Sequence, residues 1–401
     1  MKLGQKMSSD FLIVTLFFLC CLFPFISIFP INSDVQPTAA LVAAIFYTLK
    51  ILKTGKISKS SVFLILVISL AFLYINPLAT ISFEPGKLFA LVCALFTFVF
   101  IRQYNEYFST KLFSIAIKIY FTLSVLSLIF PTQLIAFQSF FVRNMNVTEF
   151  GYRGISTLST EPGLFGGLLV GLFALNIYFF YSQRITRPAF FLNLAQVLIM
   201  IGLTKSGTGF AYLMIFLTFF LIIRRYDFKR FLKVSMIAFV LFGLSFSISF
   251  KNIDVEKLGR GVDTFVKLST QPELLIADRS IAYRLYAVRV SILSLFESPF
   301  GVGHGNVEFE SQQIVEQHPS LNHFYASYGE KFHPVSSFGF YLTAYGIFFL
   351  LPIIYLLFSS LASPSFKVLS IVYMLFSYSF AFPMTWILLN LNLKRKQNKG
   401  S

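Results

Sequence analysis

A series of long apolar runs constrains this chain more than any other feature. Residues 163–181, GLFGGLLVGLFALNIYFFY, contain no charged side chain. About 20 apolar residues are enough for a helix to cross the hydrocarbon core of a bilayer. Only 12% of the 401 residues are charged, whereas soluble domains carry about 25%. The sequence therefore predicts an all-α polytopic membrane protein.

We expect about 11 or 12 transmembrane helices. The candidate spans are residues 11–29, 38–52, 62–81, 88–101, 112–130, 163–181, 189–204, 208–223, 232–250, 335–358 and 366–388. The first span follows Lys2 and Lys6, as in a signal peptide. It is too long for one and has no small-residue cleavage site, so we interpret it as a retained helix.

Basic residues in short loops predict the orientation. Lys and Arg gather at 50–59, 102–111, 184–187 and 224–233, and cytoplasmic loops carry an excess of these residues. The N-terminus is then cytoplasmic, and 131–162 and 251–334 lie outside the cytoplasm. These topology signals explain the net charge of +16 better than nucleic-acid binding does.

The basic tail conflicts with an odd number of spans. Eleven spans would place Lys394, Arg395 and Lys396 outside, against the positive-inside rule. Pro383 lies inside the last apolar run and could divide 366–393 into two short helices. Such re-entrant segments are tolerated when protein surrounds them. We favour this interpretation, which returns the tail to the cytoplasm.

The chain divides into three parts. Residues 1–250 form a transmembrane bundle, 251–334 an extracytoplasmic loop with an amphipathic helix at 280–297, and 335–401 the C-terminal membrane helices and basic tail. The loop holds all four histidines, His304, His318, His323 and His333. Cys20, Cys21 and Cys93 lie within apolar runs, so no disulfide framework is expected.

The entry into the span at 163–181 combines a helix start with possible chemistry. Pro162 suits the first turn of a helix, and the glycines that follow every fourth residue let another helix approach closely. A helix N-terminus favours anions. Glu161 either complements the helix dipole or acts as an acid or base in a cavity, with Arg153 nearby for an anion.

Residues 277–306 contain a second candidate. An apolar stripe recurs at helical spacing, formed by Ile281, Leu285, Val288, Ile292, Leu295 and Phe296. Arg284 and Arg289 flank it on opposite sides, as in a helix lying in the membrane interface. Their side chains either extend toward lipid headgroups or bind phosphate oxygens, for which the guanidinium fork is well suited.

Two further residues map to the same side of the membrane. His333 directly precedes the span at 335–358, and its ordinary pKa of about 6.5 would allow it to act as a general base. Lys205 lies in the tight turn LTKSGTG. The alternatives are a polar interface residue for His333 and a simple turn marker for Lys205.

No motif predicts a metal or an organic cofactor. The chain has no GxxxxGK[ST], no HExxH and no paired aspartates of the D-x-D type. The GVGHG run at 301–305 is a flexible turn without P-loop spacing, and the spacing of His318 and His323 is not specific for a metal. We expect neither a metal nor a cofactor.

The order of these features resembles the O-antigen polymerase and O-antigen ligase group of bacterial membrane glycosyltransferases. The resemblance rests on R-G-x-x-x-x-x-x-E-P at 153–162, K-S-G-T-G at 205–209, YRLYAVRVSILSLFESPFGVGHGN at 283–306, and a histidine at 333 before AYGIFFLLP at 344–352. It covers most of 150–352, whereas the earlier spans add only hydropathy.

The resemblance implies a GT-C-like, metal-independent transferase that uses an oligosaccharide on undecaprenyl pyrophosphate. Arg284 and Arg289 would bind the pyrophosphate, and Arg153 the donor phosphate or sugar. His333 would orient or deprotonate the acceptor, with Glu161 as a second candidate base. Lys205 stands where some relatives have Arg, so it would contact phosphate without a guanidinium fork.

The expected function is a polysaccharide polymerase for O-antigen or capsule in the bacterial inner membrane. It would join two lipid-linked repeat units at the outer face, with membrane lipid and a chain-length regulator as further partners and no nucleic acid. One alternative is an O-antigen ligase that transfers the finished chain to the lipid A core. Another is a flippase for lipid-linked oligosaccharide. Polar residues gathered at one face favour an interfacial enzyme, since transporters tend to carry charge near the midplane.

Reporter fusions test the predicted orientation. Alkaline phosphatase fused within 251–334 should be active and fusions within 50–59 inactive, because the enzyme folds only outside the cytoplasm. Fluorescent-protein fusions at the same points should give the reverse pattern. Cytoplasmic reporter signals from 251–334 would contradict the placement of the candidate residues.

Overall fold

The computed structural model describes most of the chain. The described residues are 7–27, 35–55, 66, 69, 85–142, 154–223, 279–319, 321, 336–360, 362–376 and 379–393. Every regular element among them is a helix and none is a strand, which confirms the all-α prediction. The candidate span at 232–250, and that at 62–81 apart from residues 66 and 69, lie outside them.

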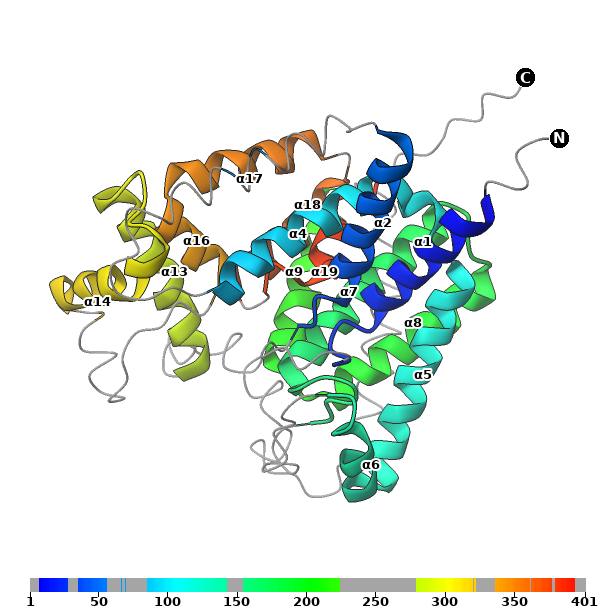
Figure 1. Cartoon of the computed structure of the whole chain (residues 1–401). Helices are drawn as coiled ribbons and strands as arrows, with labels where there is room; N and C mark the ends of the chain where they lie inside the picture. The colour runs from blue at the N-terminus through cyan, green and yellow to red at the C-terminus, as the bar shows by residue number, and fades with distance from the viewer. Residues whose placement is uncertain are drawn as a thin grey trace, which may run out of the picture.

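The helices form a bundle with a side group attached (Figure 1). The bundle contains α1 (Met7–Leu22), α2 (Thr38–Thr54), α4 (Pro85–Tyr104), η1 (Asn105–Tyr107), α5 (Thr110–Ile129), α6 (Pro131–Gln138), α7 (Pro162–Tyr181), α8 (Arg187–Leu203), α9 (Gly207–Ile223), α18 (Pro364–Phe376) and α19 (Pro383–Leu388). The side group contains α13 (Arg279–Glu297), η3 (His304–Asn306), α14 (Val307–Gln317), α16 (Ser337–Tyr345) and α17 (Ile347–Ser359).

Three of the described helices are long and apolar enough to cross a membrane. They cover Gly86–Tyr107, Thr110–Ile129 and Pro162–Tyr181. Five shorter apolar helices, Phe11–Leu22, Arg187–Leu203, Gly207–Ile222, Ile347–Ser359 and Pro364–Phe376, coincide with other candidate spans. The described residues therefore contain fewer full-length spans than the 11 or 12 expected.

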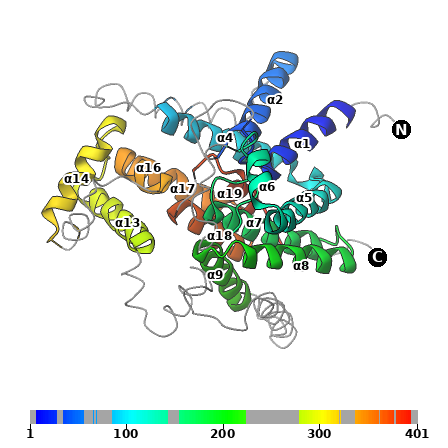
Figure 2. The same ribbon diagram turned by 90° about the horizontal axis from the view of Figure 1, so that it is seen from below.

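Helix α7 lies at the centre of the bundle (Figure 2), and most of its residues are buried. The glycine spacing explains its position, because a side chain at Gly171 would collide with Met384, whose Cγ would lie 2.3 Å from the added Cβ. The Tyr373 hydroxyl donates to the Gly167 carbonyl oxygen at 2.7 Å. Small residues thus admit α18 and α19 against α7, as the sequence predicted.

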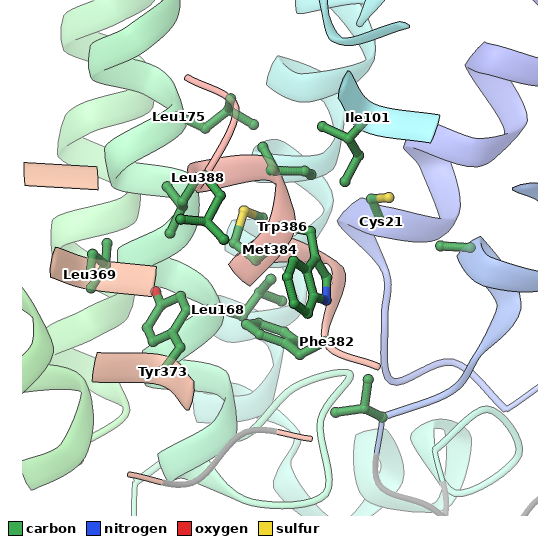
Figure 3. Close-up of a cluster of buried hydrophobic side chains, with 14 of the residues drawn as sticks. Cys21, Ile101, Leu168, Leu175, Leu369, Tyr373, Phe382, Met384, Trp386 and Leu388 are labelled. Carbon is green, nitrogen blue, oxygen red and sulfur yellow. The ribbon is translucent and has the colours of Figure 1, made fainter. Parts of the chain in front are cut away.

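Helix α19 is short and entirely enclosed by protein. All its residues are buried, and Figure 3 shows Met384 and Trp386 packed among side chains from several other helices. The Trp386 indole donates to the Phe380 carbonyl at 2.7 Å. Close packing attracts helices to one another in lipid, so these large, fully buried side chains make the segment a principal part of the core.

Side-chain donors add to the backbone hydrogen bonds around this short helix, in which the Thr385 carbonyl already accepts from the Leu389 N–H at 3.3 Å. The Ser370 hydroxyl donates to the Thr385 carbonyl at 3.1 Å, and the Asn390 amide to the Trp386 carbonyl at 2.9 Å. The Ser360 hydroxyl donates to the Leu389 carbonyl. Because buried backbone groups without partners are costly, these donors permit the non-helical chain around α19 to remain in the interior.

The structure confirms that the last apolar run is divided at Pro383. Helix α18 ends at Phe376, and Pro383 is the first residue of α19. The chain then returns to the start of α18, where the Ser363 N–H donates to the Leu391 carbonyl at 2.9 Å. Residues 391–393 therefore lie at the same end of α18 as residue 363. The membrane side of the basic tail stays a prediction.

The single span predicted at 335–358 is wrong. It is broken into α16 and α17 at Gly346, which has φ 53° and ψ −129°. The Val302 and Gly303 N–H groups donate to the Thr343 and Ala344 carbonyls at 3.1 and 3.0 Å. The turn after α13 thus occupies the break, which hydropathy could not reveal because it depends on a distant segment.

Glycine at position 346 is required by both its dihedral angles and its surroundings. An added Cβ would lie 2.1 Å from the Pro299 carbonyl oxygen. Gly55, which ends α2, provides a matched comparison, since it has φ 61° but nothing within 4 Å of an added Cβ. Strain at positive φ alone costs an ordinary residue about 1–2 kcal/mol.

We expect Gly346→Ala to destabilise the protein more than Gly55→Ala. The first substitution adds a backbone collision to the dihedral strain, whereas the second adds only the strain. Thermal unfolding of the purified variants in detergent measures the difference. Equal melting temperatures would show that the 298–303 turn does not constrain the break.

Candidate functional site

Helices α7 and α9 begin side by side. Gly166 and Gly209 face each other so closely that a Cβ on Gly209 would lie 2.9 Å from the Gly166 Cα. The Ser206 hydroxyl accepts a hydrogen bond from the Gly209 N–H at 3.2 Å and caps α9. Two helix N-termini, each with a partial positive charge, therefore adjoin.

The segment that leads into α7 lies against the end of α8. The Ile155 N–H donates to the Leu203 carbonyl at 3.1 Å. A Cβ on Gly154 would lie only 2.3 Å from the same oxygen, so no larger residue fits there. This contact brings the R-G-x-x-x-x-x-x-E-P stretch next to the KSGTG turn. The sequence analysis assigned both stretches to the same side of the membrane but predicted no contact between them.

Backbone strain is concentrated at this junction. Thr157 has φ 43° and Lys205 has φ 46°, and the remaining non-glycine residue with positive φ in the described ranges is Gln183, at the opposite end of α7. Threonine is β-branched and rarely adopts this conformation. Strained residues of this kind cluster at functional sites, so the junction is a candidate on backbone grounds as well.

The side chains of Glu161 and Thr208 border the same small space. A Cβ atom added to Gly163 would lie 3.2 Å from Glu161 Oε1 and 3.8 Å from Thr208 Oγ1. Glu161 occupies the N-cap position of α7, but its carboxylate makes no capping hydrogen bond. The carboxylate is therefore not used to cap the helix.

Arg284 reaches this space from the side group. Its Nη1 donates to Thr208 Oγ1 at 3.1 Å. Both side chains are half-buried. Figure 2 shows α13 on the side of the bundle formed by α9 and α18. The hydrogen bond joins residues 76 positions apart in the sequence and brings a guanidinium, a hydroxyl and a carboxylate to the adjoining helix N-termini.

Arg289 lies in a different environment from Arg284. It is exposed, as are Leu285, Ile292 and Phe296. The buried face of α13 instead consists of Ala287, Val290, Ser291 and Ser294. The predicted apolar stripe thus lies largely on the outer surface of the protein. Arg284 and Arg289 flank it on opposite sides, as the helical wheel predicted.

Two predicted site residues cannot be placed. Arg153 and His333 lie outside the described residues, so their roles stay predictions. Gly154, which follows Arg153, is fixed against Leu203 and Thr204. Lys205 is half-buried, three positions before Thr208.

No family model matches this chain. Comparisons with curated proteins and with solved structures also found no match. Among the described residues, no three His, Cys, Asp or Glu side chains form a group that could hold a metal ion.

Three threonines lie at the site without any sequence signal that predicts a functional role. Thr157 and Thr160 are buried, and their hydroxyl oxygens have no hydrogen-bond partner within the described ranges. Thr208 contacts Arg284 directly. Threonine is too common for its presence to indicate a site, although the two flanking glycines, Gly207 and Gly209, were a usable signal for close packing around Thr208.

His304 is a second residue whose environment the sequence did not predict. It is only 2% exposed and packs edge-on against Phe340, with ring centroids 4.8 Å apart. Burial lowers the pKa of His304, and the nearby Lys87 cation lowers it further. The flexible turn expected at 301–305 is therefore an ordered contact between the side group and the start of α4.

His304 should make stability depend on pH. Because its pKa is lowered in the folded state, the unfolded chain binds more protons once the pH falls below about 6.5, the ordinary histidine value. Stability contributed by the neutral imidazole is complete above that pH and is lost as the pH falls. Thermal unfolding between pH 8 and 5 should show a smaller decline for His304→Gln than for the wild type.

Equal slopes for the wild type and His304→Gln would contradict the assignment of a buried neutral imidazole at 304.

Proposed function

We propose that this protein is a membrane glycosyltransferase that polymerises lipid-linked repeat units of a bacterial surface polysaccharide. The observation that carries the proposal is that Arg284 contacts Thr208 and that Glu161 lies close to the same threonine, at the adjoining starts of α7 and α9. A carboxylate and a fixed cation at one place suit transfer of a group away from a diphosphate. The resemblance to O-antigen polymerases implies that this group is an oligosaccharide.

Arg284 and the two helix N-termini are the proposed binding site for the pyrophosphate. Guanidinium groups bind phosphate oxygens in a bidentate manner, and helix N-termini attract anions through free N–H groups and the helix dipole. The buried hydroxyls of Thr157 and Thr160 are further donors for phosphate or sugar, since buried polar groups normally have partners.

Glu161 is the proposed base. A hydroxyl of the acceptor sugar attacks the anomeric carbon of the donor, a new glycosidic bond forms, and the bond from that carbon to undecaprenyl pyrophosphate breaks. The carboxylate takes the proton of the attacking hydroxyl, and the diphosphate leaves with its negative charge held by Arg284. Positioned general bases contribute about 10²–10⁴ to such rates.

The remaining candidates have supporting roles in this proposal. Lys205, in the strained turn before α9, would add positive charge near the phosphates, and Arg153 would hold the donor. His333 would orient the acceptor. Arg289 would meet phosphate or lipid headgroups from the outer surface of α13, because it is exposed beside Leu285 and Ile292.

The exposed stripe of α13 supports a location at the membrane interface. Leu285, Ile292 and Phe296 are 46%, 45% and 77% exposed, and apolar side chains on one face of a helix favour insertion among lipid headgroups. We infer a multi-pass protein of the cytoplasmic membrane, with the start of α13 at headgroup depth. A lipid-linked diphosphate lies at the same depth.

Purified protein in vesicles tests the chemistry. With undecaprenyl-pyrophosphate-linked repeat units as both donor and acceptor, the wild type should form a ladder of longer chains. Glu161→Gln should lower kcat at least about hundredfold, since it removes a positioned base. Glu316→Gln, at an exposed position of α14, is the matched control and should keep wild-type activity. Full activity of Glu161→Gln would exclude Glu161 as the base.

A deletion in the source bacterium separates the alternatives. Loss of a polymerase should leave single repeat units on the cell surface. Loss of a ligase should leave none on the lipid A core, and loss of a flippase should trap the lipid-linked units inside. Either of the last two phenotypes would replace the proposed function.

A further inference from the structure

The only side chain in the first three residues of α9 belongs to Thr208. Gly207 and Gly209 flank it, and the close approach of Gly209 to Gly166 leaves no room for a larger residue. The N-terminal cap of α9 is made by Ser206. The Thr208 hydroxyl is therefore not needed to cap the helix and can make a different contact.

This contact is a hydrogen bond with Arg284. The guanidinium Nη1 donates to Thr208 Oγ1 at 3.1 Å, a distance typical of a well-formed hydrogen bond. A long arginine side chain has many rotamers, and ordering it carries an entropic cost. Threonine restricts its own hydroxyl, because a β-branched side chain has few χ1 states in a helix. It is thus a suitable fixed acceptor for a mobile cation.

The hydroxyl also has a proton to donate. Oγ1 accepts from Arg284 through a lone pair, so its O–H is free to point in another direction. The small space above Gly163, which Glu161 Oε1 also borders, lies within reach. Thr208 therefore contacts the cation, and a Cβ added to Gly163 would lie 3.8 Å from its hydroxyl oxygen and 3.2 Å from Glu161 Oε1.

We propose that Thr208 is a positioning residue that holds the Arg284 guanidinium at the adjoining starts of α7 and α9, beside Glu161. This inference rests on the proposed function, in which Arg284 stabilises the leaving diphosphate. Thr208 fixes one of the five N–H donors of the guanidinium, and the others remain for phosphate oxygens. The benefit is a cation placed before substrate arrives, which lowers the reorganisation that the reaction requires.

Kinetics in vesicles test the catalytic part. Thr208→Val keeps the shape of the side chain and removes the hydroxyl, and we expect kcat to fall about tenfold to hundredfold, the range for loss of a hydrogen bond to a charged group. Thr208→Ser keeps the hydroxyl and should restore most of kcat. The KM for the lipid-linked donor should change less than kcat, because other donors also hold the substrate. Failure of Thr208→Ser to restore kcat would overturn the inference.

A matched control is available in α4. Thr97 is fully buried, and its hydroxyl has no partner within the described residues. Thr97→Val therefore makes the same chemical change far from Arg284 in the sequence and should leave kcat unchanged. An equal loss of kcat in both valine variants would show a general packing defect and would overturn the positioning role.

A double-mutant cycle tests the contact without any reference to activity. Thermal unfolding is measured for the wild type, Thr208→Val, Arg284→Met and the double variant. The stability losses of the two single variants should add up to more than the stability loss of the double variant, because each single substitution removes the same hydrogen bond. Strict additivity would overturn the inference whatever the protein catalyses.

The two assays separate the possible failures. If the cycle shows coupling but Thr208→Val retains full kcat while Arg284→Met is inactive, Thr208 does not position Arg284 for the reaction and the inference fails. If the wild type forms no polymer, the proposed function fails, and the cycle alone still decides whether Thr208 holds Arg284.

Discussion

The need to satisfy buried backbone groups governs this structure. An apolar chain can place irregular segments in its interior only where other groups supply hydrogen bonds. Ser360, Ser370 and Asn390 do this for the chain around α19, and the turn after α13 does it for the break between α16 and α17. These two irregular segments set how α18 meets the core and how the side group is attached.

Small residues extend the same principle to the candidate site. Gly166 and Gly209 let α7 and α9 meet at their starts, and Gly154 lets the preceding segment lie on the end of α8. Each contact brings backbone close to backbone. Polar side chains from two separate stretches of sequence are thereby gathered where the N–H groups of two helices begin, and α13 adds a guanidinium to them.

The sequence predicted these elements better than their contacts. Apolar runs located α7 and α13 to within a residue or two, and the proline at 383 indicated the division before α19. The break at Gly346 could not be predicted, since its cause is the backbone of 299–303. The role of Thr208 could not be predicted either, because it depends on a hydrogen bond from Arg284, which lies 76 positions away in the sequence.

The turn that fills the break between α16 and α17 has a consequence for biogenesis. Residues 298–303 are synthesised before 343–347. The Val302 and Gly303 N–H groups donate to carbonyls of the later segment, and the Ile347 N–H donates back to the Pro299 carbonyl. The ribosome therefore completes residues 298–303 before it synthesises the backbone groups of 343–347 with which they form hydrogen bonds. The break between α16 and α17 needs both segments, so α17 can take its final position only after residues 298–303 have packed against the end of α16.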